Sequence, residues 1–332
     1  MRRHTTAELR QMQSLPLDAK IAMTKLRIRE WYNNYDGQVY VSFSGGKDST
    51  VLKHIVDSMY SDVPAVFVNT GLEYPEIQHF VREVKAGKWD CFNSDVEILR
   101  PDMRFDEVVK KYGYPVISKE VSQSLYEVSR SALLHNIPKR ETRPYFRKFS
   151  KNGPYASKKS TFSFAKYDFL LDAPFGVSHM CCRVMKKKPA HSYEKSTGRK
   201  PFIGTTADES RLRMSQWMQR GCNAFEAKRP TSQPLSFWTE QDVLNYIKSF
   251  DVPYCSVYGE IKEDDKGRLI TTGANRTGCM FCMFGVHLEK EPNRFQRMQI
   301  SHPKQYAYCM DKLGLREVLE YVGVPYECKK EK

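Results

Sequence analysis

The stretch Ser-Phe-Ser-Gly-Gly-Lys-Asp-Ser-Thr, residues 42–50, constrains the fold more than any other part of the 332-residue chain. An apolar run at 39–41 comes before it, and apolar residues at helical spacing follow from 51 to 59. This order predicts a β-strand that turns directly into a helix. Gly45 and Gly46 let the backbone approach an anion closely, and the free N–H groups and dipole of the next helix attract one. The stretch therefore predicts a phosphate-binding loop.

The side chains of this loop supply the chemistry that a nucleotide site needs. Lys47 brings a positive charge, Asp48 can hold Mg²⁺, and hydroxyl groups can bind phosphate oxygens. A Walker loop or a Rossmann turn would need glycines at other spacings. The candidate nucleotide-binding residues of the loop are therefore Ser42, Ser44, Gly45, Gly46, Lys47, Asp48, Ser49 and Thr50. The alternative is a Ser- and Gly-rich turn that binds no ligand.

The loop closely resembles the pyrophosphate loop (PP-loop) of the adenine nucleotide alpha-hydrolase superfamily. Enzymes of that superfamily cut ATP between the α and β phosphates and commonly leave an adenylylated substrate. The resemblance implies an ATP site in which Lys47 and Asp48 are the catalytic residues. Lys47 would lie at the leaving pyrophosphate, and Asp48 would hold Mg²⁺.

Apolar runs and helical patterns alternate along much of the chain. The short apolar runs predict further strands at 65–68, 96–99 and 201–204. Helices are predicted at 17–35, 74–85, 105–112, 118–135, 208–218 and 238–250. This alternation predicts an α/β fold with a doubly wound parallel sheet.

Changes in composition suggest three regions. We expect an N-terminal helical segment at 1–36 and a PP-loop ATP-binding α/β domain at 37–253. A basic, aromatic insertion interrupts that domain at about 137–166. The last region, 254–332, is expected to be a cysteine-bearing, mostly helical extension.

The net charge favours anionic partners. Lys and Arg total 53 against 39 Asp and Glu, which gives a net charge of +14. Such an excess suits nucleotides and nucleic acid. The apolar runs fall short of the ~20 residues that span a bilayer, and no signal-peptide pattern follows Met1. We therefore expect a cytoplasmic protein with no membrane contact, and the sequence leaves its oligomeric state open.

Cations and aromatic rings are mixed in the stretch 139–166. It has nine basic residues and one acid, with six aromatic residues between them. Phosphates held by charge and bases stacked on rings are typical of single-stranded or flipped nucleotides, so the stretch favours a nucleic-acid acceptor. A solvated loop whose aromatic residues pack onto the core is the alternative. The cations are Lys139, Arg140, Arg143, Arg147, Lys148, Lys151, Lys158, Lys159 and Lys166.

Four of the nine cysteines form a constellation. Cys181 and Cys182 are adjacent, and Cys279 and Cys282 form a C-x-x-C. In an intracellular chain these thiols should be reduced and able to ligate a metal. The tandem pair favours a [4Fe–4S] cluster, whereas four thiolates also suit Zn²⁺. Buried thiols without metal are the alternative.

The cysteine motifs resemble those of the assimilatory sulfonucleotide reductases, the PAPS reductase-like family. Cys-Cys-Arg-Val-Met-Lys at 181–186 is similar to the family's cysteine pair, and Gly-Cys-Met-Phe-Cys at 278–282 to its later C-x-x-C. The likeness covers about 38–285 and implies that Cys181, Cys182, Cys279 and Cys282 ligate a [4Fe–4S] cluster. The element Asn-Thr-Gly at 69–71 is similar to the family's Asp-Thr-Gly near adenosine, with Asn69 in place of the acid. It implies that Asn69, Thr70 and Gly71 bind the nucleotide. The polar segment at 205–213 follows a predicted strand, at the end where open parallel sheets bind ligands, so Arg211 or Arg213 is expected to bind phosphate.

Two departures separate the chain from a typical sulfonucleotide reductase. Those reductases have a degenerate phosphate loop, whereas Lys47 and Asp48 are both present here. Their catalytic cysteine lies in a Glu-Cys-Gly-x-His tail, whereas Glu327-Cys328 is followed by Lys-Lys-Glu-Lys. Cys328 is either a mobile nucleophile activated by lysines or an incidental thiol.

An intact PP-loop with a cluster resembles the ATP-dependent sulfur-insertion enzymes, including DNA phosphorothioation sulfurtransferases and cluster-bearing tRNA thiolases. The leading hypothesis is thus an ATP pyrophosphatase that adenylylates an acceptor for sulfur transfer, with a nucleic acid as the expected acceptor. A cysteine desulfurase or a thioredoxin-type protein would be the donor. The alternatives are a thioredoxin-dependent adenylylsulfate or PAPS reductase and a non-catalytic nucleic-acid-binding partner.

Overall fold

The computed structural model describes residues 4–156 and 162–328. Lys158 and Lys159 of the basic stretch, and the residues after Cys328, lie outside the described residues. The chain divides into two compact units that alternate along the sequence. Unit 1 comprises Met1–Asn69, Glu73–Arg100 and Pro189–Thr277, and unit 2 comprises Thr70–Leu72, Pro101–Lys188 and Gly278–Lys332. The sequence-based ranges 37–253 and 254–332 therefore each contribute to both units.

Unit 1 is built on a sheet in the order β3-β2-β1-β5-β7-β6. Its neighbouring strands are parallel except for the antiparallel pair of β6 and β7. The predicted α/β fold with a mostly parallel sheet is confirmed, and the short strands β6 and β7 were not predicted. The strands are β1 (Val39–Ser42), β2 (Ala65–Val68), β3 (Val96–Leu99), β5 (Lys200–Ile203), β6 (Asn223–Ala224) and β7 (Thr231–Ser232).

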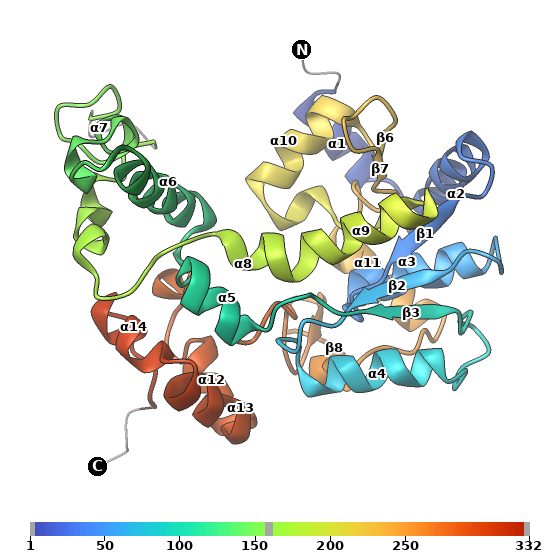
Figure 1. The fold of residues 1–332 in the computed structure, drawn as a ribbon. Coiled ribbons are helices and arrows are strands. Elements are labelled where there is room, and N and C mark those ends of the chain that lie inside the picture. Colours follow the sequence, from blue (N-terminus) through green and yellow to red (C-terminus); the bar gives the residue numbers. More distant parts are fainter. Residues whose placement is uncertain (1–3, 157–161, 329–332) are drawn as a thin grey trace. The chain divides into compact units, whose positions relative to one another are not determined.

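Apolar residues on both faces of the central strands explain why helices cover the sheet on both sides. On one face, Val39 and Val41 join a core that includes residues of α3 (Lys47–Asp57) and α4 (Pro75–Lys85). On the other face, Tyr40 packs with Tyr193 of α9 (Lys188–Thr197). Figure 1 shows α9 and α4 along opposite sides of the strands. This arrangement is typical of buried parallel strands.

The remaining helices of unit 1 follow the predicted pattern closely, with one correction. The helix predicted at 208–218 is broken, because Ser210 is extended and its hydroxyl accepts from the N–H of Arg213, which caps a new helix. The helix predicted at 238–250 begins with the expected capping box between Thr239 and Asp242. These helices are α1 (Thr6–Gln13), α2 (Leu17–Asn34), η4 (Ala207–Glu209), α10 (Arg211–Arg220), α11 (Glu240–Ser249) and η5 (Ser256–Tyr258).

A β-hairpin, which the sequence did not predict, lies in the glycine-rich part of unit 1. Strands β8 (Ile261–Glu263) and β9 (Leu269–Thr271) pair in antiparallel fashion. Asp264 accepts from the N–H groups of Lys266 and Arg268 and so fixes the turn between them. The hairpin leads into residues 273–277, which return to the PP-loop.

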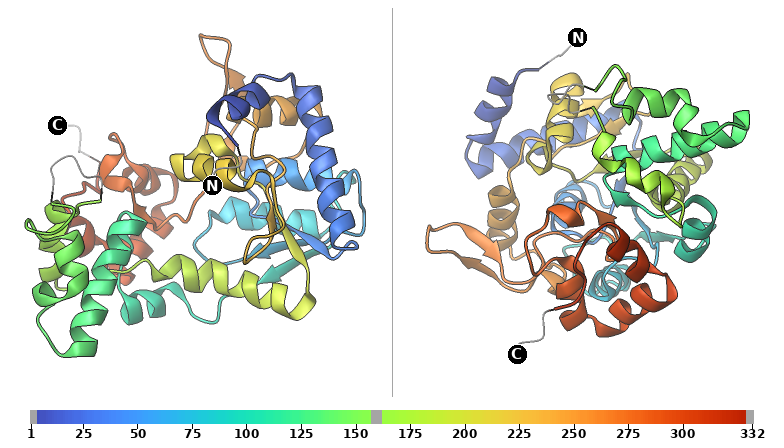
Figure 2. Two further views of the ribbon diagram at one scale, coloured as in Figure 1. Left: turned by 90° about the horizontal axis from the view of Figure 1, so that it is seen from above. Right: turned by 90° about the vertical axis from the view of Figure 1, so that its left-hand side faces the viewer.

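Unit 2 is mostly helical, and among its described residues the short strands β4 (Val116–Ile117) and β10 (Met283–Phe284) pair in parallel. Figure 2 shows its helices from two further directions, with α6 and α7 in green. Between the cysteine pair and α9, the backbone forms a π-helical turn, η3 (Arg183–Lys187). The helices are α5 (Phe105–Tyr112), α6 (Lys119–His135), η1 (Lys139–Glu141), α7 (Arg143–Lys148), η2 (Ala165–Asp172), α8 (Met180–Cys182), η6 (Val286–Leu288), α12 (Arg294–Ser301), α13 (Pro303–Ala307), η7 (Tyr308–Lys312) and α14 (Leu315–Tyr321).

In the part of the chain that the structure describes, no helix combines the length and the apolar character needed to cross a bilayer.

Candidate functional site

The PP-loop lies where the strand order of the sheet reverses. From β1 the chain continues to β2 and β3 on one side, whereas β5 pairs with the other side of β1. Ligands of open α/β sheets bind at the carboxyl ends of the strands beside such a switch point. Residues 43–50 follow β1 there, and residues 204–209 follow β5. The fold therefore places two polar segments predicted from the sequence at one sheet edge.

The backbone of the loop has a shape that allows close approach to an anion. Gly45 has a φ of +71°, a conformation that glycine adopts without strain. Gly46 is the N-cap of α3 and has no side chain to cap the first N–H groups of the helix. The hydroxyl of Ser49 bonds the Gly46 carbonyl at 2.9 Å and lies 2.9 Å from the hydroxyl of Ser44. The two serines thus brace the loop, and Thr50 adds a 3.0 Å bond to the same carbonyl.

Gly204 allows the segment after β5 to approach the start of α3. A Cβ atom at Gly204 would lie 2.8 Å from Ser49 Cα and 2.9 Å from the Asp48 carbonyl oxygen. Both neighbours are backbone atoms, so no flexible side chain can move aside. Gly204 was not a candidate from the sequence, although a glycine directly after a strand is a signal of such close approach.

Gly204→Ala is expected to lower the free energy of unfolding by about 1–3 kcal/mol, because the added methyl group forces the backbone of α3 to shift. Urea denaturation of the two proteins measures the difference. Gly278→Ala is the matched control, since a Cβ there meets nothing within 4 Å. Equal losses in the two variants would contradict the packing argument.

Lys47 is buried, and its donors have partners. Its ammonium donates to the carbonyl oxygen of Asn275 at 2.7 Å and lies 2.9 Å from a carboxylate oxygen of Glu240. Its backbone N–H donates to the Tyr258 hydroxyl at 3.2 Å. The ammonium also lies 5.4 Å from the centre of the Tyr258 ring. Sequence patterns gave no sign of Tyr258, because the tyrosine belongs to no recognisable motif.

Asp48 lies in an environment suited to a cation. Burial raises the pKa of the Asp48 carboxyl, and the charge of Lys47 opposes this rise. The carboxylates of Glu209 and Glu240 raise the pKa further. A bound divalent cation would offset this mutual repulsion, so the surroundings are compatible with Mg²⁺.

The other nucleotide-binding candidates are placed as follows. Asn69 follows β2 in unit 1, and its N–H donates to the Leu99 carbonyl at 2.8 Å. Thr70 and Gly71 belong to unit 2, where the Thr70 hydroxyl accepts from the Leu72 N–H at 3.2 Å. Arg211 is exposed at the first turn of α10 in unit 1. Their roles toward a nucleotide stay predictions.

The four candidate metal ligands all lie in unit 2. The Cys181 thiol donates to the Cys182 sulfur at 3.9 Å. This bond lowers the pKa of Cys182 to about 6, with help from Lys119, Lys186 and Lys187. The charges of Cys279 and Cys282 in turn act on Cys181, whose pKa the hydrogen bond and burial raise. The fold thus brings the two cysteine motifs within electrostatic reach of each other.

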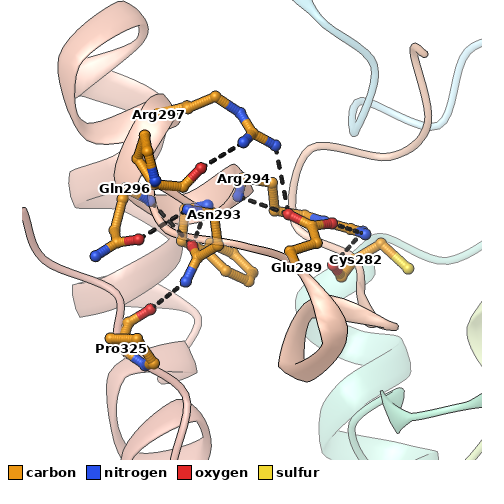
Figure 3. A network of polar contacts seen from close by, with 9 residues as sticks. Cys282, Glu289, Asn293, Arg294, Gln296, Arg297 and Pro325 are labelled. Atoms are coloured by element: carbon orange, nitrogen blue, oxygen red, sulfur yellow. Dashed lines mark hydrogen bonds and ion pairs between the residues drawn. The ribbon is translucent and has the colours of Figure 1, made fainter. Parts of the chain in front are cut away.

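A side chain of helix α12 contacts the backbone of the C-x-x-C motif (Figure 3). Arg294 donates to the Cys282 carbonyl at 2.9 Å and is itself bound by the carboxylate of Glu289. On the same helix, Asn293 bonds the Pro325 carbonyl, and Gln296 bonds the Glu327 carbonyl at 3.0 Å. Figure 3 shows these side chains converging on one end of the helix.

Cys328 is docked on α12. Its N–H donates to the Gln299 side chain at 2.8 Å, and its sulfur lies 3.5 Å from the Gln296 carbonyl oxygen. The interpretation of Cys328 as a mobile nucleophile would therefore require these contacts to open. Two further cysteines, Cys222 and Cys255, are buried, and burial raises the pKa of Cys255 to about 11.

The thiol set fits a metal centre in its chemistry. Four sulfur donors share one unit with lysines that favour thiolate. His179, two residues before the pair, has a buried Nδ1 with no hydrogen-bond partner among the described residues. Within residues 4–156 and 162–328, however, no three His, Cys, Asp or Glu side chains are grouped as metal ligands. The thiols would therefore have to turn toward one another to bind a metal.

Some side chains of the basic aromatic stretch pack within unit 2, and others are exposed. Phe149 and Phe164 are buried, and the Lys148 ammonium lies about 5 Å from the rings of Tyr155, Phe162 and Phe164. Arg140 is paired with Asp168 and Asp172. Those groups thus stabilise the unit itself.

Helix α7 keeps an exposed face in this stretch. It presents Arg143, Phe146 and Arg147, and Phe146 is 51% exposed. Residues at this spacing lie on one side of a helix. The Phe146 ring and the two arginine side chains therefore remain accessible to a partner.

Comparison with known proteins supports the resemblance seen in the sequence. The phosphoadenosine phosphosulfate reductase domain family matches residues 38–132 and 149–283, which is more than half of the chain. An adenosine 5'-phosphosulfate reductase of Staphylococcus haemolyticus is 24% identical over 239 residues, covering 70% of each chain. An uncharacterized protein of Methanocaldococcus jannaschii is 36% identical over 90 residues, covering 26% of this chain and 18% of that protein.

Among solved structures, the phosphoadenylyl-sulfate reductase of Candida auris in a phosphate complex aligns with a TM-score of 0.39 at 16% identity. The alignment covers 80% of this chain and 97% of that chain. The match to the family over two long stretches is what assigns the chain. It belongs to the phosphoadenosine phosphosulfate reductase domain family.

Proposed function

We propose that this chain is an ATP pyrophosphatase that adenylylates an acceptor for sulfur transfer. The supporting observation is the intact PP-loop at the switch point, where Lys47 and the uncapped start of α3 gather donors beside Asp48. Such a group of donors suits a pyrophosphate leaving group.

The first step would be attack of an acceptor oxygen on the α phosphorus of ATP. The bond between that phosphorus and the bridging oxygen breaks, and pyrophosphate leaves with the electron pair. Lys47 and the N–H groups of α3 would neutralise the charge that develops on pyrophosphate, and Asp48 would hold Mg²⁺. A sulfur nucleophile then displaces AMP from the activated acceptor.

Cys181, Cys182, Cys279 and Cys282 would hold a [4Fe–4S] cluster, which supplies a binding site for sulfur. Anaerobically purified protein should contain iron and acid-labile sulfide in equal amounts. Zinc in a colourless preparation would instead assign the thiols to a Zn²⁺ site.

We propose a nucleic acid as the acceptor, on the strength of the exposed Arg143, Phe146 and Arg147 and the net charge of +14. The test measures pyrophosphate and AMP formed from ATP and Mg²⁺ in the presence of single-stranded RNA or DNA. Formation that depends on the oligonucleotide supports the proposal. Turnover that no nucleic acid stimulates would exclude it as acceptor.

The second candidate is a sulfonucleotide reductase, favoured by the similarity to a protein named adenosine 5'-phosphosulfate reductase. It predicts sulfite release from adenylylsulfate that requires a thioredoxin-type reductant and Cys328. Activity that survives Cys328→Ser would exclude this mechanism. Salt-sensitive nucleic-acid binding without any turnover would favour a non-catalytic partner instead.

A further inference from the structure

The donors of Lys47 that a phosphate would need are already bound within unit 1. The backbone N–H of Lys47 donates to the Tyr258 hydroxyl at 3.2 Å, and its ammonium donates to the Asn275 carbonyl at 2.7 Å. Both partners act as oxygen acceptors, as a phosphate oxygen would. A phosphate that took these two donors would therefore replace both acceptors.

One acceptor, the Asn275 carbonyl, belongs to the short segment 275–277, and the other, the Tyr258 hydroxyl, is bonded to that segment. Thr277 is bonded to the Tyr258 hydroxyl at 2.7 Å. A Cβ at Gly46 would lie 3.2 Å from the Tyr258 hydroxyl and 3.3 Å from the Thr277 hydroxyl, so both groups lie against the loop backbone. Arg276, between Asn275 and Thr277, reaches the Glu209 carbonyl at 3.4 Å.

Tyr258 and residues 275–277 differ in how deeply they are buried. The Tyr258 ring is buried in the core of unit 1. Residues 275 and 276 are exposed, and polar contacts join Asn275 to Lys47 and Arg276 to the Glu209 carbonyl. Polar contacts made by exposed residues open at lower cost than the packing of a buried ring. Residues 275–277 are thus the side that can move.

We propose that residues 275–277 form a strap that occupies the Lys47 ammonium, a phosphate donor of the PP-loop, and is displaced when phosphate binds. The Thr277–Tyr258 hydrogen bond is its anchor. This inference rests on the proposed function, since the displacing ligand is the pyrophosphate part of ATP. While the strap is bound, the protein cannot bind the ligand through this donor. A weaker anchor should therefore increase the fraction of molecules that can bind and so tighten ligand binding.

The experiment titrates inorganic pyrophosphate and a non-hydrolysable ATP analogue into the full chain by calorimetry. Thr277→Val removes the anchoring hydroxyl and keeps the side-chain shape. It is expected to bind both ligands about 2- to 10-fold more tightly, the range that one hydrogen bond can provide. Thr272→Val is the matched control, because the Thr272 hydroxyl accepts from the Glu260 N–H instead. Its affinity should equal that of the original chain.

A second measurement follows the strap itself. Trypsin cleavage after the exposed Arg276 should become faster when pyrophosphate binds, since displacement frees this segment. Equal affinities of the Thr277→Val variant and the original chain, or protection of Arg276 by pyrophosphate, would overturn the strap and leave the ATP site intact. Absence of binding in all variants would overturn both proposals. Tighter binding by Thr277→Val without any acceptor-dependent AMP would overturn the proposed function alone.

Discussion

Lys47→Met is expected to reduce pyrophosphate release from ATP by about 10²- to 10³-fold, the usual effect of removing one electrostatic donor from a reacting centre. The ammonium is the positive charge of the PP-loop, and methionine keeps most of the side-chain volume. Initial rates of pyrophosphate formation at saturating ATP and acceptor measure the effect.

The control for this prediction is Glu240→Gln, which removes the carboxylate that lies 2.9 Å from the Lys47 ammonium. Because Glu240 is 54% exposed, its loss should leave the fold and the turnover largely unchanged. If Lys47→Met were as active as the original chain, the leaving-group role of Lys47 would be wrong.

Lys53→Met is expected to lower the free energy of unfolding by about 3–5 kcal/mol, the cost of leaving a buried charge without its partner. The Lys53 ammonium is fully buried in α3, 2.7 Å from an Asp57 carboxylate oxygen and 2.7 Å from the Asn93 carbonyl. Burial lowers the pKa of Lys53 and raises that of Asp57, which shows how strongly each charge depends on the other. Urea denaturation provides the measurement.

The double variant Lys53→Met/Asp57→Leu should recover much of this loss, because no unpaired charge remains. Lys88→Met is the surface control, since Lys88 is 52% exposed beside Glu83 and such pairs contribute about 0–1 kcal/mol. A double variant as unstable as Lys53→Met alone would show that packing, rather than charge, determines the loss.

Local sequence patterns predicted the elements that define the nucleotide site. The strand, glycine turn and helix at 39–57 follow from residues close together in the chain, and so does the capping box at Thr239. The family resemblance was confirmed by the comparison with known proteins. The break before α10 was missed because Ser210 caps a helix inside an otherwise continuous helical pattern.

Contacts between distant residues could not be predicted in the same way. Tyr258 reaches Lys47 from 211 positions along the chain, and Arg294 reaches the Cys282 carbonyl through a helix that carries no motif. The pairing of β1 with β5 likewise depends on packing rather than on any local pattern. Sequence patterns specify such contacts only weakly, because tertiary structure decides which side chains meet.

The alternation of the two units has a consequence for protein engineering. The backbone passes between them after Asn69, Leu72, Arg100, Lys188 and Thr277, five times in all. Neither unit can therefore be isolated by trimming one terminus, because each is assembled from three separate segments. A chimera that takes one unit from a related protein would need a compatible fusion point at each of the five positions. The segment that carries Lys47 and the segments that carry the cysteines therefore cannot be exchanged by a single cut in the chain.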